Sequence, residues 1–141
     1  MIRMPPVIVV IVWGAIASLI VGAIYLFLVD TGTFNHLGLP MSMTDNLAAF
    51  FGRKAVEGGV AGLLFLLPLW SHHFQWKRGI GLGFIYSFYY FLILYPQRGL
   101  GYFGMQHGTD FAIKVTIVGL VMALLWGVIT GWLLRWSRLR A

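Results

Sequence analysis

Four long apolar runs alternate with short polar segments along the chain. They cover about residues 7–29, 51–71, 79–95 and 112–134. A helix needs about 20 apolar residues to cross the hydrocarbon core of a bilayer, with a range of about 17–25, so each run is long enough to span it. We therefore predict an all-α, polytopic membrane protein, a single transmembrane domain over 1–141 with helices at about 5–30, 47–71, 79–95 and 110–135.

The composition supports a membrane domain and excludes some chemistry. Of the 141 residues, 60% are hydrophobic and 10% are charged, whereas a soluble domain carries roughly a quarter charged residues. The sequence contains no cysteine, which excludes thiol catalysis, disulfides and thiolate-bound clusters. The net charge of +6 comes from basic residues that lie mostly at the ends of apolar runs, so it indicates membrane topology rather than nucleic-acid binding.

The distribution of lysine and arginine predicts the orientation. With the N-terminus inside, the cytoplasmic side holds Arg3, Lys77, Arg78, Arg135, Arg138 and Arg140. The outer side holds Arg53, Lys54, Arg98 and Lys114. Because short cytoplasmic segments carry an excess of basic residues, this bias favours both termini in the cytoplasm. We expect a bacterial inner (cytoplasmic) membrane or a thylakoid-type membrane.

Small residues recur at a spacing of four in every apolar run, where they permit close approach of helix backbones. The stripes consist of Gly14, Ser18 and Gly22; Gly58 and Gly62; Gly79, Gly83 and Ser87; and Gly119, Ala123, Gly127 and Gly131. Phe51, Lys54, Gly59 and Leu64 also recur at the same spacing as Phe111, Lys114, Gly119 and Leu124. We therefore predict two helical hairpins related as a repeat. The stripes either pack this bundle or face another subunit.

A charged cluster precedes the second apolar run. Arg53 and Lys54 lie four and three residues before Glu57, so either base can reach the acid on a helix. Near the outer boundary long basic side chains reach the headgroups, and Lys114 is interpreted in the same way. Glu57 lies deeper, roughly 9 Å inside, so it must pair, be protonated or face a wet cavity. Tyr86 and Tyr90 share a helix face and are candidates to meet it.

No reaction motif accompanies this cluster. Sequences of the GxSxG, HExxH and CxxC types are absent. His36 and His107 lie on the two outer loops and are the only metal candidates considered, but two distant histidines favour ordinary loop residues, so we predict no metal site. We predict no intrinsic cofactor either, leaving open a bound lipid or a cofactor shared with partner subunits.

Three functions fit these features. The first is a non-catalytic accessory or structural subunit of a larger, energy-transducing membrane complex, which explains the many packing stripes and the lack of a reaction motif. The second is a small homo-oligomeric transporter or channel that uses Glu57 with Arg53, Lys54 and Lys114. The third is an enzyme acting on a lipid or a quinone. We rank them in this order, with membrane lipids and other membrane subunits, or further copies of the chain, as partners and no nucleic acid.

Overall fold

The computed structural model describes residues 6–36, 38, 46–67, 75–97 and 101–140. Every regular element in these ranges is helical, without any strand. In chain order the elements are α1 (Pro6–Asp30), α2 (Thr33–His36), α3 (Leu47–Gly62), the 3-10 segment η1 (Leu63–Leu66), α4 (Gln75–Tyr89), the π-helical segment η2 (Tyr90–Leu94), α5 (Tyr95–Gln97), the 3-10 segment η3 (Tyr102–His107) and α6 (Thr109–Arg140).

Three helices are long and apolar enough to cross a membrane. They cover Val7–Asp30 in α1, Lys77–Gln97 from α4 through α5, and Thr109–Trp136 in α6. The predicted all-helical fold with several membrane-crossing helices is therefore confirmed at this level. The middle one contains a π-helical segment just before Pro96. A proline has no backbone N–H and displaces the carbonyl four residues earlier, which explains the wider turn.

The second apolar run forms a shorter helix than predicted. Helix α3 has 16 residues and ends at Gly62, where the chain tightens into η1 before Leu67 becomes extended. Three glycines in α3 lower its helix propensity. The sequence continues with Pro68, and a residue before proline is disfavoured in the helical region. The last part of the predicted helix, residues 68–71, lies outside the described residues.

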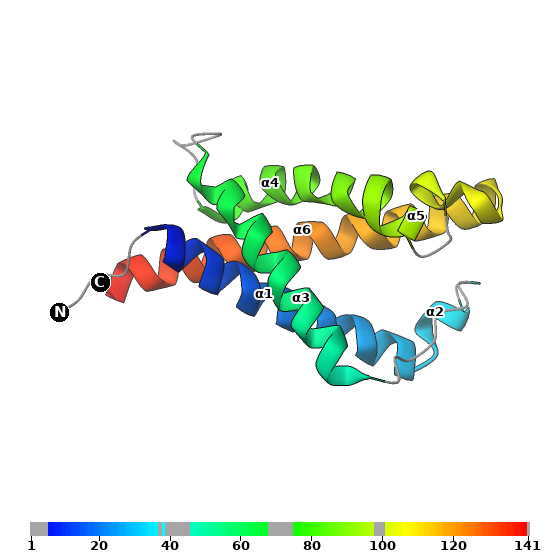
Figure 1. The fold of residues 1–141 in the computed structure, drawn as a ribbon, viewed down its shortest axis with the longest axis horizontal. Coiled ribbons are helices and arrows are strands. Elements are labelled where there is room, and N and C mark those ends of the chain that lie inside the picture. The colour runs from blue at the N-terminus through cyan, green and yellow to red at the C-terminus, as the bar shows by residue number, and fades with distance from the viewer. Residues whose placement is uncertain (1–5, 37, 39–45, 68–74, 98–100, 141) are drawn as a thin grey trace.

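The helices pack as two crossed pairs. Helix α1 packs along α3 and α4 packs along α6, and the pairs meet chiefly where α1 lies against α6. The four segments thus form an open row in the order α3, α1, α6, α4 (Figure 1). The beginning of α1 and the end of α6 lie at the same end of the molecule, whereas α2 and η3 lie at the other (Figure 1).

Glycines set both crossings within the pairs. A Cβ atom on Gly58 of α3 would lie 2.6 Å from the carbonyl oxygen of Gly14 in α1, and one on Gly83 of α4 would lie 2.5 Å from that of Ala123 in α6. No side chain fits at such distances, so the backbones touch directly. In lipid, where burial alone does not drive association, these contacts hold the helices together.

The other small residues predicted for packing lie near these crossings or beside aromatic rings. Gly62 faces Val10 and Gly14, Gly79 faces Gly127, Gly22 faces Phe50, Gly119 faces Tyr95, and Ser18, Ser87 and Gly131 are buried. The repeat suggested by the sequence equates Gly59 with Gly119. Gly59 nevertheless faces Ile11 in the neighbouring helix α1, whereas Gly119 faces Tyr95 and Phe91 before α6 begins, so the two glycines have different surroundings.

Two buried polar side chains bond to backbone carbonyls at the joints of the fold. The indole N–H of Trp126 in α6 donates to the carbonyl oxygen of Gly14 at 3.0 Å and so links the two pairs. Arg78 at the start of α4 is only 7% exposed and donates to the carbonyls of Phe65 and Leu67, at 3.1 and 2.7 Å. These carbonyls lie at the end of η1, where helical acceptors lack intrahelical partners and a cation is favourable.

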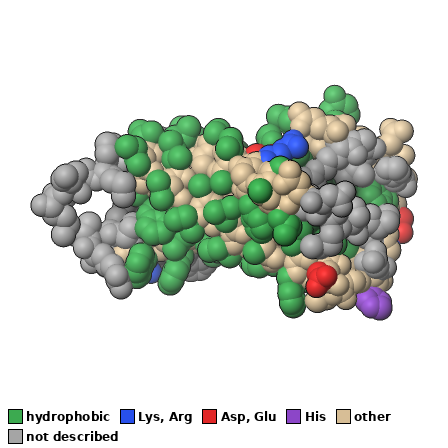
Figure 2. Space-filling model, turned by 60° about the horizontal axis from the view of Figure 1, so that its bottom comes forward, with side chains coloured by type: hydrophobic (Ala, Val, Ile, Leu, Met, Phe, Trp, Pro, Cys, Tyr) green, Lys and Arg blue, Asp and Glu red, His purple; other side chains and the backbone are tan. Residues whose placement is uncertain are grey.

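Apolar side chains dominate the surface along the helices. Large hydrophobic residues such as Phe27, Val56, Ile113, Ile117 and Trp132 are more than half exposed. On the face in Figure 2, hydrophobic side chains cover the middle of the molecule, and the visible acidic and histidine side chains lie toward one end. A surface of this kind suits a hydrocarbon surrounding rather than water.

Candidate functional site

The central feature is an ion pair on α3. Asn46 caps this helix by accepting a hydrogen bond from the backbone N–H of Ala49, and the helix then places Arg53 one turn before Glu57. The Nε of Arg53 lies 3.0 Å from Oε1 of Glu57. The carboxyl side chain is only 9% exposed, whereas the guanidinium side chain is 54% exposed. Arg53 therefore balances the charge of a nearly buried acid from the edge of the molecule.

The segment from α4 through α5 contributes two more groups. The hydroxyl of Tyr89 donates to Oε1 of Glu57 at 3.0 Å, and Arg53 donates to Oε1 of Gln97 at 3.1 Å. The π-helical turn lies between Tyr89 and Gln97, so its extra residue sets where Gln97 falls relative to Arg53. The ion pair thus bonds across from one helix pair to the other.

Two polar atoms beside this network have no hydrogen-bond partner among the described residues. They are Oε2 of Glu57 and the hydroxyl oxygen of Tyr86, and both are shielded from the surroundings. The ring of Tyr86 is stacked parallel to that of Tyr89, with centroids 5.8 Å apart, so it lies next to the ring that bonds Glu57. A buried polar atom without a partner costs about 1–3 kcal/mol, which makes this pair of atoms unusual.

A groove of about 490 Å³ lies between α3 and α4 at this place. Three polar side chains line it, those of Glu57, Tyr86 and Tyr89. The remaining walls are apolar and consist of Val56, Val60, Ala61, Leu64 and Ile85. The groove exists because α3 packs extensively on α1 rather than on α4. Its volume falls within the range of about 300–1,000 Å³ that is usual for small-molecule sites.

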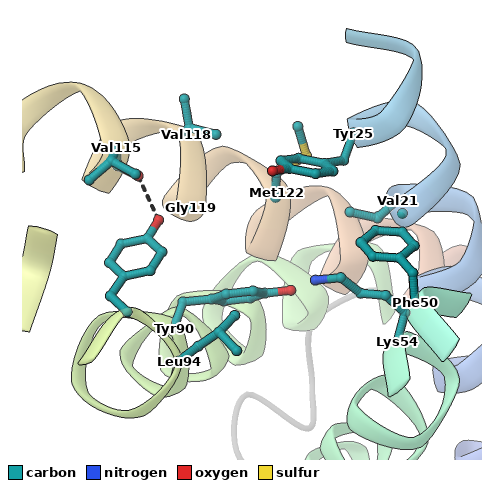
Figure 3. A pocket seen from close by; sticks show the side chains of 12 residues that line it. Val21, Tyr25, Phe50, Lys54, Tyr90, Leu94, Val115, Val118, Gly119 and Met122 are labelled. Carbon is teal, nitrogen blue, oxygen red and sulfur yellow. Dashed lines mark hydrogen bonds between the residues drawn. The ribbon is translucent and has the colours of Figure 1, made fainter. Parts of the chain in front are cut away.

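Lys54 points away from Glu57 and into a second, smaller cavity. This cavity of about 70 Å³ lies between the two helix pairs, with Val21, Tyr25 and Met122 in its walls. The ammonium group and the Tyr90 hydroxyl point toward one another across it (Figure 3). The Lys54 nitrogen lies 5.1 Å from the centre of the Tyr90 ring and 5.8 Å from that of Phe50. At these distances the rings stabilise the cation.

The structure therefore divides the residues predicted for the polar site. Arg53, Glu57 and Tyr86 gather at the groove, whereas Lys54 and Tyr90 face the smaller cavity. Lys114 joins neither place, because it pairs with Asp110 in α6 at 3.4 Å.

The two metal candidates lie in separate elements. His36 is exposed at the end of α2, and His107 is the last residue of η3. Within the described ranges, no group of three or more potential ligands is placed to hold a metal ion.

Several site residues were not identified as such from the sequence. Tyr89 was recognisable, because it lies three residues after Tyr86 and so falls on the same helix face. Gln97 has no such signal, since a π-helical turn separates it from Tyr89. Arg78 was interpreted as a cytoplasmic charge, but its partners are carbonyls, which any sequence can supply.

The groups of the groove are suited to binding. Oε1 of Glu57 is satisfied by Arg53 and Tyr89, and the second carboxylate oxygen and a tyrosine hydroxyl remain as an acceptor and as a donor or acceptor. No protein-family model, no curated protein and no solved structure matches the chain. Conclusions about function therefore come from this geometry.

Proposed function

We propose that the chain is a non-catalytic accessory subunit of a larger, energy-transducing membrane complex. The observation that carries this proposal is the open row of helices. Helix α3 stands at one end of the row, with α1 as the only long helix that packs extensively against it among the described residues. A partner chain that lies along α3 would complete the arrangement.

The side chains of α3 support a protein neighbour at this edge. Val56 and Val60 are 67% and 63% exposed, and the half-exposed Arg53 lies on the same helix. Ionisable residues within a membrane almost always face other protein groups or a water-filled cavity rather than lipid. We therefore expect the partner to cover α3 beside Arg53.

The small-residue stripes do not add to this support. Gly14 and Gly58 lie against each other inside the chain, as do Gly79 and Gly127. An interface with a second protein must then use the larger apolar side chains of α3. The proposal accordingly rests on the exposed edge of the row rather than on a surplus of glycine stripes.

The proposed topology has four spans in two hairpins, with both termini in the cytoplasm. Together α3 and η1 have 20 residues, 16 at about 1.5 Å and four at about 2.0 Å of rise, which gives about 32 Å. This length suits a hydrocarbon core of about 30 Å. The beginning of α1 and the end of α6 lie at one end of the molecule, which also supports termini on the same side (Figure 1).

Single cysteines test this topology, because the chain has no cysteine of its own. Thr33→Cys and Gln106→Cys should react with a membrane-impermeant maleimide on intact cells. Lys77→Cys, which is exposed near the start of α4, should react only after the membrane is opened. Labelling of Lys77→Cys on intact cells would contradict the orientation.

Purification in a mild detergent, with mass spectrometry of the chains that migrate together, tests the subunit proposal. A photoreactive amino acid at Val56 should capture a different membrane protein, whereas one at Ile117, 55% exposed on α6, serves as the comparison site. A protein that migrates alone, with only lipid captured at Val56, would refute the proposal. A homo-oligomer would instead favour the transporter hypothesis.

A further inference from the structure

The groove between α3 and α4 has the features of a ligand site. Its volume is about 490 Å³, and its walls are mostly aliphatic, with Val56 and Val60 exposed at the outer side. Because these residues belong to membrane-crossing segments, the groove opens toward the hydrocarbon. A molecule dissolved in the membrane could enter it without passing through water.

Two groups in the groove would bind a polar head. The side chain of Glu57 and the residue Tyr86 are 9% and 5% exposed, and each contributes an oxygen without a hydrogen-bond partner among the described residues. In lipid no water is at hand to satisfy them, so the free energy of a hydrogen bond to either oxygen is favourable. Both oxygens lie below the accessible surface of the groove, so the head group rather than the apolar body must reach them.

The charge of the site selects a neutral ligand. Glu57 is already paired with Arg53 at 3.0 Å, so a cationic head would bring an unbalanced positive charge into a medium of low dielectric constant. An anionic head would meet the carboxylate. A hydroxyl group suits both oxygens, because it donates to Oε2 of Glu57 and accepts from the hydroxyl of Tyr86.

We propose that this groove binds a neutral, membrane-dissolved molecule that carries a hydroxyl group, and that this hydroxyl bridges Glu57 and Tyr86. Long-chain and isoprenoid alcohols, diacylglycerols and quinols all have this chemistry. A ketone or a quinone only accepts hydrogen bonds, so it would leave Oε2 of Glu57 unsatisfied. The site should therefore prefer the hydroxyl form of a ligand to the carbonyl form.

The test uses the full chain in phosphatidylcholine nanodiscs with a diazirine-bearing octadecanol as the probe. Its methyl ether and the corresponding alkane serve as matched probes without a hydroxyl. We expect cross-links to Val60, Leu64 or Ile85, and binding of the alcohol about five- to tenfold tighter than that of the alkane, as one or two neutral hydrogen bonds would give. Competition by unlabelled isoprenoid alcohol, diacylglycerol and quinol then ranks the natural sources.

Tyr86→Phe is the decisive variant, because it removes a hydroxyl without a partner and should leave the fold intact. It should weaken binding of the alcohol about fivefold and leave binding of the alkane unchanged. Tyr102→Phe, at a residue 65% exposed in η3, is the matched control and should change neither. An unchanged melting temperature of the ligand-free Tyr86→Phe protein separates loss of the site from loss of folding.

Three results would overturn the proposal: equal binding of the alcohol and the alkane, equal binding by the wild type and Tyr86→Phe, or cross-links outside the groove. A partner helix seated in the groove, detected as protein captured from Val60 or Ile85, would overturn it as well. The binding test uses the purified chain alone, so its result is independent of whether the protein belongs to a larger complex.

Discussion

The two sides of α3 differ in what holds them against the rest of the chain. One side is made of Gly58 and Gly62, and it lies so close to α1 that not even a methyl group fits. The other side carries Glu57, which has one satisfied and one unsatisfied carboxylate oxygen next to a groove of about 490 Å³. The first side is determined by shape and the second by a few polar bonds. We infer that the glycine side contributes stability and that the carboxylate side is available for binding.

Substitutions on the glycine side should have the largest effect. Gly58→Ala would place a methyl group 2.6 Å from the carbonyl oxygen of Gly14 and so force α1 and α3 apart. We expect the free energy of unfolding to fall by about 2–3 kcal/mol, as overpacking of a close contact does. Unfolding by sodium dodecyl sulfate in mixed micelles measures this change.

Gly52→Ala is the matched control in the same helix. A Cβ atom at Gly52 meets nothing within 4 Å, and alanine favours the helix by up to about 1 kcal/mol over glycine. The two substitutions should therefore change stability in opposite directions. Equal effects would show that helix propensity, rather than the contact with α1, controls the glycine side.

Removal of the guanidinium should have the next largest effect. Arg53→Gln leaves the carboxylate of Glu57 without its charge partner and weakens the link to Gln97. We expect a loss of about 1–2 kcal/mol, less than for a fully buried pair because Arg53 is half exposed. The double variant Arg53→Gln with Glu57→Gln should recover part of this loss in a double-mutant cycle. Strictly additive losses would show that the two residues do not interact.

The two stacked tyrosines should respond differently to loss of their hydroxyl groups. Tyr89→Phe removes a 3.0 Å hydrogen bond to Glu57 and should cost about 1 kcal/mol. Tyr86→Phe removes a hydroxyl without a partner, so the stability of the ligand-free protein should stay the same or rise slightly. Thermal unfolding of both variants in the same detergent gives the comparison, and a larger loss for Tyr86→Phe would reverse the assignment of the two hydroxyls.

Lys114→Ala should have the smallest effect. Its partner Asp110 is 90% exposed, and the two groups are 3.4 Å apart. Exposed pairs contribute between about 0 and 1 kcal/mol, and we expect less than about 0.5 kcal/mol here. A loss as large as that of Arg53→Gln would mean that Lys114 takes part in a polar site that this structure does not bring together.

The sequence was sufficient for the fold class because hydrophobicity over 20 residues survives local irregularities. It was less reliable for α3, where glycines and Pro68 end the helix although the apolar run continues. Residue spacing also predicted that Arg53 and Glu57 lie within reach of each other, since both belong to one helix.

Partners from different helices were harder to predict. Tyr90, expected to meet Glu57, faces Lys54, and Tyr89 makes the bond. Which of two adjacent tyrosines meets α3 depends on the rotation of α4 about its axis, and a period of 3.6 residues does not fix that rotation. The burial of Arg78 likewise depends on carbonyls at the end of η1, which the sequence does not reveal.

The bond between Trp126 and Gly14 constrains how the protein is made. Its two residues are 112 positions apart in the chain, whereas Arg78 and Phe65 are 13 apart. During synthesis, α1 and α3 leave the ribosome long before Trp126 exists, so the first helix pair must reside in the bilayer as an assembled unit that still lacks its counterpart. The carbonyl of Gly14 then serves as the receiving point for the second pair. Biogenesis of this protein therefore ends with the docking of two preformed halves, and a chain truncated before Trp126 should accumulate as the first half alone.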